Sequence, residues 1–257
     1  MPAELRDTPA PALLLPDLKG RVALVTGASS AAATVDALLA NGATVFGLAL
    51  DAPRVGHAAF HALPCDLRDP AAIDRAFAAL RVKTDRLDHV VNIAGIDPKI
   101  PLAASDAAAW DEVAHLNLRA YHLVIRAALD LLRAGAGRAI VNVSSINYRL
   151  GLPGRALYAA TKAGILGLTT GLARELGQEN IRINTVSPGW IFTERQVAEY
   201  FSGPDTAKHL HHLAGVQALP LRLQPQDVAN HILFYLSEAS RASTGHNCVV
   251  DGGWLLE

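Results

Sequence analysis

Two neighbouring stretches decide the fold: Val141-Asn-Val-Ser-Ser145 and, twelve residues later, Leu157-Tyr-Ala-Ala-Thr-Lys162. The first completes an apolar run that starts at Ala139, which predicts a buried strand ending in hydroxyl groups. The second lies in a proline-free run over 156–176 with apolar residues at helical spacing, which predicts a long helix. A buried strand followed by a helix is the repeating unit of an α/β fold.

The rest of the chain repeats this alternation. Further strands are expected at 21–26, 43–49, 60–63, 87–93, 181–186 and 248–250. Helices are expected at 31–41, 70–80 and 225–237, and a pair of helices at 105–133. We therefore predict an α/β fold: a single Rossmann-like, doubly wound, parallel seven-stranded sheet with helices on both faces and ligands at the carboxyl ends of its strands. Residues 1–17 are rich in Pro and Ala, and we predict that they form a loose N-terminal arm that could pack on a neighbouring subunit. Residues 18–257 are predicted to form a single domain.

The composition limits the classes of function. The chain has 257 residues, of which 51% are hydrophobic and 18% charged, and its net charge is −1. This balance gives no electrostatic reason to expect nucleic acid or an anionic membrane as a partner. The first residues resemble neither a signal peptide nor a membrane span, and Cys65 and Cys248 fit reduced thiols. We expect a cytoplasmic protein with a small-molecule substrate.

The strand end and the helix start carry a candidate acid–base group. Tyr158 and Lys162 are four residues apart, so they share one face of the helix. A phenol has a pKa of about 10, and a nearby ammonium is expected to lower it toward the range where proton transfer is efficient. Ser145, at the end of the strand, is placed to hold a substrate oxygen beside the phenol.

These residues resemble the catalytic triad of the short-chain dehydrogenase/reductase family, and the resemblance extends from about Leu18 to Leu255. It implies that Tyr158 is the acid–base group, that Lys162 lowers its pKa and holds the nicotinamide ribose, and that Ser145 orients the substrate. Asn117, in His115-Leu-Asn-Leu118, resembles the fourth catalytic residue, which anchors a proton-relay water. The resemblance also implies a nicotinamide cofactor and a homotetramer.

The stretch Thr26-Gly-Ala-Ser-Ser-Ala-Ala-Ala33 stands where the family has the glycine-rich turn Thr-Gly-x-x-x-Gly-x-Gly. Gly27 is the one glycine left, and the turn is two residues shorter than the family pattern. Two readings stay open. In one, Ser29 and Ser30 hydroxyls replace amide contacts to the pyrophosphate; in the other, the cofactor site is weakened or lost.

The other cofactor contacts follow from the resemblance. In the family an acidic residue at the position of Ala49 binds the adenosine ribose; here Asp51, two residues further on, would take this part. Its carboxylate weakly favours NAD over NADP. The nearest cation that could bind a 2′-phosphate is Arg54. The remaining contacts carried over from the family are Asp66, Leu67, Asn92, Ala94, Gly95, Pro188, Ile191 and Thr193.

The segment from Gly189 to Gln196 resembles that of the aldose 1-dehydrogenases, which oxidise sugars to lactones. Asn147, Arg155, Trp190 and Gln196 would then line the substrate pocket with Ser145, and Asp97-Pro-Lys99 would border it. Residues 196–212 would form a mobile lid. Three histidines at 209, 211 and 212 fit a solvated helix better than a metal site, so no metal is expected. The alternatives are a cofactor-impaired homologue with a structural role and a carbonyl reductase acting on a substrate other than a sugar.

Overall fold

Seven parallel strands form one sheet in the order β3-β2-β1-β4-β5-β6-β7, which confirms the predicted fold. The computed structural model describes residues 4–51 and 55–256. The strands are β1 (Val22–Thr26), β2 (Thr44–Ala49), β3 (Phe60–Pro64), β4 (His89–Asn92), β5 (Ala139–Val143), β6 (Arg182–Pro188) and β7 (Asn247–Val250). The chain order reverses between β1 and β4, and such a switch point leaves a crevice at the carboxyl ends of the strands.

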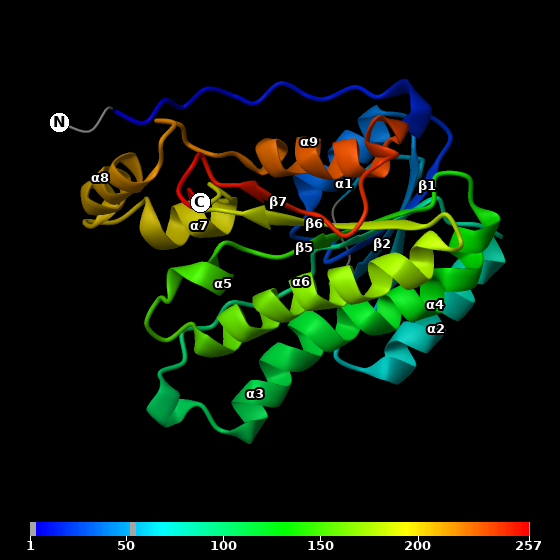
Figure 1. Cartoon of the computed structure of the whole chain (residues 1–257), viewed down its shortest axis with the longest axis horizontal. Coiled ribbons are helices and arrows are strands. Elements are labelled where there is room, and N and C mark those ends of the chain that lie inside the picture. Colours follow the sequence, from blue (N-terminus) through cyan, green and yellow to red (C-terminus); the bar gives the residue numbers. More distant parts are fainter. Residues whose placement is uncertain (1–3, 52–54, 257) are drawn as a thin grey trace.

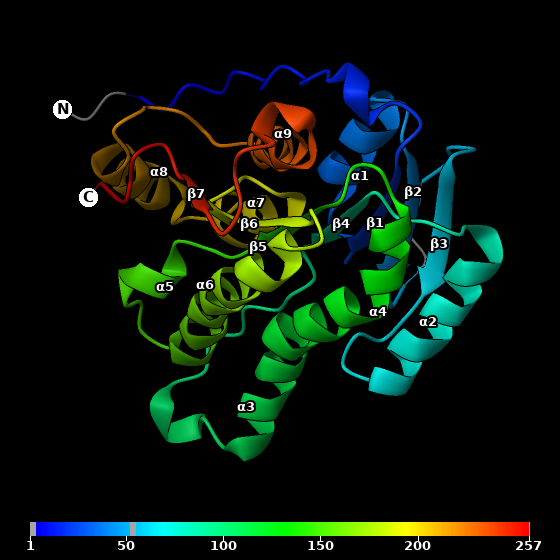
Figure 2. The same ribbon diagram turned by 45° about the vertical axis from the view of Figure 1, so that its right-hand side comes forward.

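Helices cover both faces of the sheet (Figures 1 and 2). One face carries α1 (Ala32–Ala40) and α9 (Pro225–Leu236), and the other carries α2 (Pro70–Lys83), α4 (Ala120–Ala134) and α6 (Ala156–Gly177). Successive side chains of a strand point to opposite faces. In β1, Val22 and Leu24 accordingly join the core under α2, α4 and α6, while Ala23 and Val25 join the core under α1 and α9.

Four further helices follow strands β4, β5 and β6 at their carboxyl ends: α3 (Ala107–Ala114), α5 (Asn147–Leu150), α7 (Glu194–Tyr200) and α8 (Thr206–Val216). A π-helical turn, His115–Arg119, joins α3 to α4, the two helices of the pair that the sequence predicts. Residues 196–212, expected as a lid, lie in α7, in α8 and in the segment between them.

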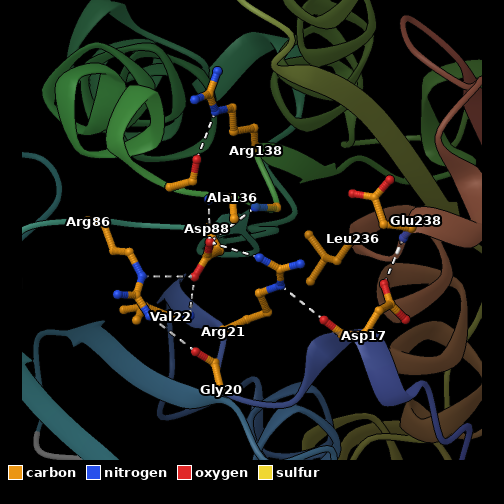
Figure 3. A network of polar contacts seen from close by, with 12 residues as sticks. Asp17, Gly20, Arg21, Val22, Arg86, Asp88, Ala136, Arg138, Leu236 and Glu238 are labelled. Carbon is orange, nitrogen blue, oxygen red and sulfur yellow. Dashed lines mark hydrogen bonds and ion pairs between the residues drawn. The ribbon is translucent and has the colours of Figure 1, made fainter.

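The amino ends of the three central strands are joined by one buried carboxylate (Figure 3). Asp88 is 1% exposed and accepts hydrogen bonds from the amides of Val22 at 2.8 Å, Ala136 at 2.7 Å and Gly137 at 3.1 Å. Arg21 and Arg86 each lie 3.6 Å from its oxygens. Burial alone would raise the pKa of Asp88, but the amide donors outweigh it and hold that pKa below the ordinary value. The carboxylate therefore fixes β1, β4 and β5 relative to one another.

The N-terminal arm is bound to its own chain over residues 4–17, so the expectation of a loose arm is wrong there. Arg6 pairs with the segment between α8 and α9, accepting from the Arg222 amide at 2.9 Å and donating its own amide to Pro220 at 2.9 Å. The Leu13 amide donates to the Asn230 side chain on α9. An extended segment leaves its backbone groups unpaired, and these groups find partners on the surface that the arm crosses (Figure 1).

Within the described residues, 4–51 and 55–256, none of the helices is both long enough and apolar enough to cross a bilayer.

Candidate active site

Ser145, Tyr158 and Lys162 meet in one cavity beyond the carboxyl end of β5. Ser145 follows that strand by two residues, whereas Tyr158 and Lys162 lie in the first two turns of α6. The Ser145 hydroxyl is near enough to the phenol to lower its pKa. The Lys162 ammonium lies 5.6 Å from the centre of the Tyr158 ring and donates to the Val143 carbonyl at 2.9 Å. The structure thus brings a hydroxyl, a phenol and an ammonium together in one cavity.

Burial controls the acid–base state of the pair. It raises the pKa of Tyr158 to about 12, against a smaller lowering by the Ser145 hydroxyl. Burial also lowers the pKa of Lys162 to about 8, against the opposing charge of Asp97. The pKa of the phenol is therefore raised and not lowered as the sequence predicts, because the loss of hydration outweighs the Ser145 hydroxyl and the two nearby arginines. Lys162 is only 3% exposed, so its own charge is costly.

Asn117 lies in the π-helical turn and is fully buried. Its side-chain oxygen accepts from the Ile96 amide at 2.9 Å, and its side-chain nitrogen donates to the Ile96 carbonyl at 2.8 Å and to Thr161 at 3.4 Å. A Cβ at Gly95 would lie 3.1 Å from the Asn117 oxygen and 3.6 Å from the Lys162 ammonium. Asn117 therefore fixes the segment after β4 beside the lysine. π-Helical turns are frequent at functional sites.

The side chain of Ser144 holds the end of β5 against α6. Its hydroxyl donates to the Lys162 carbonyl at 2.8 Å and joins the end of β5 to α6.

The turn after β1 combines a glycine that cannot be replaced without strain with a helix start that no side chain caps. Gly27 has φ +67°, and a Cβ there would lie 2.9 Å from the Ala94 backbone, so both the conformation and the close approach require glycine. The N-cap residue of α1 is Ala31, which has no side chain that could accept hydrogen bonds from the first amides of the helix. Unpaired amides at a helix start favour an anion. Ser29 and Ser30 are exposed at this turn, and the Ser30 hydroxyl donates to the Gly27 carbonyl at 3.0 Å.

The other residues proposed from the cofactor pattern fall into two groups. Gly95, Pro188, Ile191 and Thr193 line the cavity, whereas Ala94 is buried between the end of β4 and Gly95. Thr193 also caps α7 by accepting from the Gln196 amide at 3.2 Å.

The second group lies outside the cavity. Asn92 is fully buried and donates to Asn142 at 3.0 Å, so its side chain joins β4 to β5. Asp66 is bound by Arg68, whose hydrogen bond lowers the pKa of the carboxyl, and Leu67 is buried. Asp51 is exposed beyond β2, and Arg54 lies outside the described residues.

The cavity has a volume of about 520 Å³, and every residue proposed for the substrate lines it. Asn147 donates to the Ser145 hydroxyl at 3.3 Å. The Trp190 indole donates to the Gln196 side chain at 2.7 Å, which orients the ring. Arg155 reaches the carboxylate of Asp97 at 3.3 Å. Polar groups and an aromatic face thus surround the Ser145 hydroxyl and the Tyr158 phenol, as in a site for a small polar ligand.

Comparison with known proteins agrees with this geometry. A family model described as "Enoyl-(Acyl carrier protein) reductase" matches residues 25–255. D-xylose 1-dehydrogenase from Caulobacter vibrioides is 34% identical over 256 residues, covering 94% of this chain and 98% of the relative. "Probable galactose dehydrogenase GalD" from Rhizobium meliloti is 35% identical over 256 residues, covering 95% and 98%.

The chain is a short-chain dehydrogenase/reductase. It also resembles the solved 3-oxoacyl-[acyl-carrier protein] reductase from Brucella melitensis, with a TM-score of 0.85 and 29% identity over 99% of this chain and 100% of that one. The protein is therefore an oxidoreductase of this family, whose members use NAD(P).

Sequence reasoning missed several residues that line the cavity of this dehydrogenase. Asp97 and Lys99, expected at its border, do line it, and so do Arg195, Tyr200, His209, His212 and Trp254. His211 and His212 are exposed, as a solvated helix predicts, although His212 also packs against Trp254, whereas His209 is half-buried and packs edge-on against Tyr200. These residues come from α7, from α8 and from the C-terminal segment, and no local pattern marks their convergence. Over the described residues, no group of three His, Cys, Asp or Glu side chains is arranged for a metal ion.

Proposed function

We propose that this dehydrogenase oxidises the C1 hydroxyl of an aldose to a lactone with NAD(P) as the second substrate. The observation that carries the proposal is the meeting of the Ser145 hydroxyl, the Tyr158 phenol and the Lys162 ammonium in one polar cavity. The bound nicotinamide supplies the hydride acceptor.

The chain's own residues move the proton. The Ser145 hydroxyl holds the substrate oxygen beside Tyr158, and the phenolate accepts the hydroxyl proton as the C–H bond breaks. General base catalysis of this kind contributes about 10²–10⁴-fold. Lys162 stabilises the phenolate in the reacting complex, and Asn117 anchors the relay that returns the proton to water.

The choice of a sugar rests on the cavity and on the relatives. Asn147, Gln196 and the Trp190 ring offer the hydrogen-bonding groups and the flat apolar face that a polyol needs. Two relatives at 34% and 35% identity are named as xylose and galactose dehydrogenases. The match to a 3-oxoacyl reductase supports a carbonyl reductase as the second candidate.

The exposed carboxylate of Asp51 beyond β2 supports a preference for NAD, since an acidic group there favours the free ribose hydroxyl. The homotetramer and the cytoplasmic location stay predictions of the sequence.

Titration with NAD and with NADP, followed by the fluorescence of Trp190 and Trp254, tests the cofactor. Initial rates on a panel of aldoses and on 3-oxoacyl esters then separate the two candidate reactions. Tyr158→Phe should lower turnover at least 100-fold while nucleotide affinity changes less than threefold. Failure of both nucleotides to bind would sink the proposal.

A further inference from the structure

Cationic side chains outnumber carboxylates among the residues that line the cavity. Among its described lining residues are four cationic side chains, those of Lys99, Arg155, Lys162 and Arg195, and a single carboxylate, that of Asp97. Lys162 belongs to the catalytic group, so three cations and one anion belong to the part of the cavity that receives the substrate. A neutral aldose needs no such excess of positive charge.

The carboxylate of Asp97 is already shared between two of these cations. One of its oxygens lies 2.7 Å from Arg195 and the other lies 3.3 Å from Arg155, which also donates to the Asp97 carbonyl. Glu199 also lies 4.0 Å from Arg195, so the two arginines face two carboxylates, and the unbalanced positive charge beside the catalytic group is that of Lys99. The two arginines also differ: the Arg155 side chain is 12% exposed, whereas that of Arg195 is 63% exposed. Arg195 is therefore the one with room to contact a ligand.

Lys99 provides the second accessible cation. It is exposed, and its ammonium lies 4.7 Å from the centre of the Tyr200 ring. Tyr200 ends α7, the helix that begins one residue before Arg195. The loop after β4 and helix α7 therefore place Lys99 and Arg195 on the same cavity. Clefts lined by charge of one sign concentrate ligands of the opposite sign.

We infer that the substrate of this dehydrogenase carries an oxyanion, a carboxylate or a phosphate, bound by Arg195 and Lys99 at a distance from the hydroxyl that is oxidised. This inference rests on the proposed function and names the substrate class for the same cavity. The oxidation itself is unchanged: the hydroxyl proton goes to Tyr158, the hydride goes to the nicotinamide, and the oxyanion takes no part in bond changes.

The test uses the purified full chain, NAD, and three matched sets of sugars built on glucose, galactose and mannose. Each set contains the free aldose, its uronate and its 6-phosphate, so the two sources of negative charge are compared directly. We expect kcat/KM for one anionic form to exceed that of its neutral parent at least tenfold. Raising the salt from about 0.05 M to about 0.5 M should shrink this ratio, because salt screens exposed charges.

Variants assign the effect to residues. Arg195→Met should lower the ratio of anionic to neutral kcat/KM at least tenfold, and Lys99→Met should lower it several-fold, whereas the exposed Arg174→Met on α6 serves as the matched control. If Arg195 only holds α7 to Asp97, its loss will reduce turnover of both sugar forms equally, and the inference is overturned.

Failure of the inference differs from failure of the proposed function. Neutral aldoses oxidised as well as their uronates and phosphates would overturn the inference and leave the function intact. If no sugar is oxidised, calorimetric titration with the uronates and phosphates in the presence of NAD decides. Binding that is lost in Arg195→Met supports the oxyanion site without sugar oxidation, and absence of binding overturns both.

Discussion

Replacing Lys162 by Met should make the ligand-free protein more stable while destroying its activity. The ammonium is 3% exposed, and burial lowers its pKa from about 10.5 to about 8. Each pH unit is worth about 1.4 kcal/mol, so holding this charge in the folded state costs about 3 kcal/mol near pH 7. Methionine has a similar length and carries no charge to bury.

The substitution also removes a hydrogen bond. The Val143 carbonyl loses the lysine donor but still accepts from the Tyr121 hydroxyl at 3.1 Å, so this loss costs about 1 kcal/mol. The net gain in unfolding free energy is then about 2 kcal/mol at pH 7. Turnover should fall at least 100-fold, because no ammonium remains to stabilise the phenolate.

The pH dependence gives the sharpest check. The folded pKa lies below the unfolded one, so the unfolded state binds more protons and the stability of the native chain rises as pH increases from about 8 toward 10.5. Urea unfolding without nucleotide at pH 7 and pH 9.5 should show the advantage of Lys162→Met shrinking by about 2 kcal/mol. Lys208→Met, at an exposed position on α8, is the control. A variant less stable than the native chain at pH 7 would refute the reasoning.

Three further substitutions test the frame of the site. Asp88→Asn should lower the unfolding free energy by about 2–4 kcal/mol at pH 7, because one amide oxygen replaces a carboxylate that serves three amides and two arginines. Since the folded pKa of Asp88 is lowered, this loss should disappear in acid as the native carboxylate is protonated, and a urea midpoint independent of pH would contradict it. Gly27→Ala should weaken NAD binding at least tenfold in calorimetry, whereas Gly20→Ala, at φ +73° with open space, carries the conformational cost alone and should leave binding unchanged. Asn117→Leu should lower kcat about 10–100-fold with KM for NAD changed less than threefold, and an equal loss in both would indicate general disorder of the site.

The layered fold could be predicted from the sequence because each strand and helix carries its own local pattern. The apolar run before Ser144 and Ser145 and the helical spacing after Leu157 are properties of short stretches, so they indicate strand and helix without any knowledge of the partners. Asp69 before Pro70 similarly marks the start of α2, where its side chain accepts from the Ala71 amide at 2.9 Å.

Features that depend on the path of connecting segments could not be predicted in this way. Arg195, His209 and Trp254 reach one cavity from three separate segments, and nothing in the residues around each one encodes that meeting. Burial has a larger effect than nearby charges on the pKa of Tyr158. The size of this effect depends on how much water the surrounding elements exclude, which the spacing of residues along the chain does not indicate. The attachment of the arm is likewise made through backbone groups such as that of Arg6, which every sequence contains.

The wide turn at His115–Arg119 has a consequence for anyone redesigning this protein. A regular helix through α3 and α4 would have one residue fewer in that turn, and removing a residue would rotate everything before it by about 100°, the angle each residue takes in a helix of 3.6 residues per turn. Asn117 would then leave Ile96. A sequence optimised for ideal helical geometry would therefore gain in regularity and lose the residue that ties the segment after β4 to the lysine.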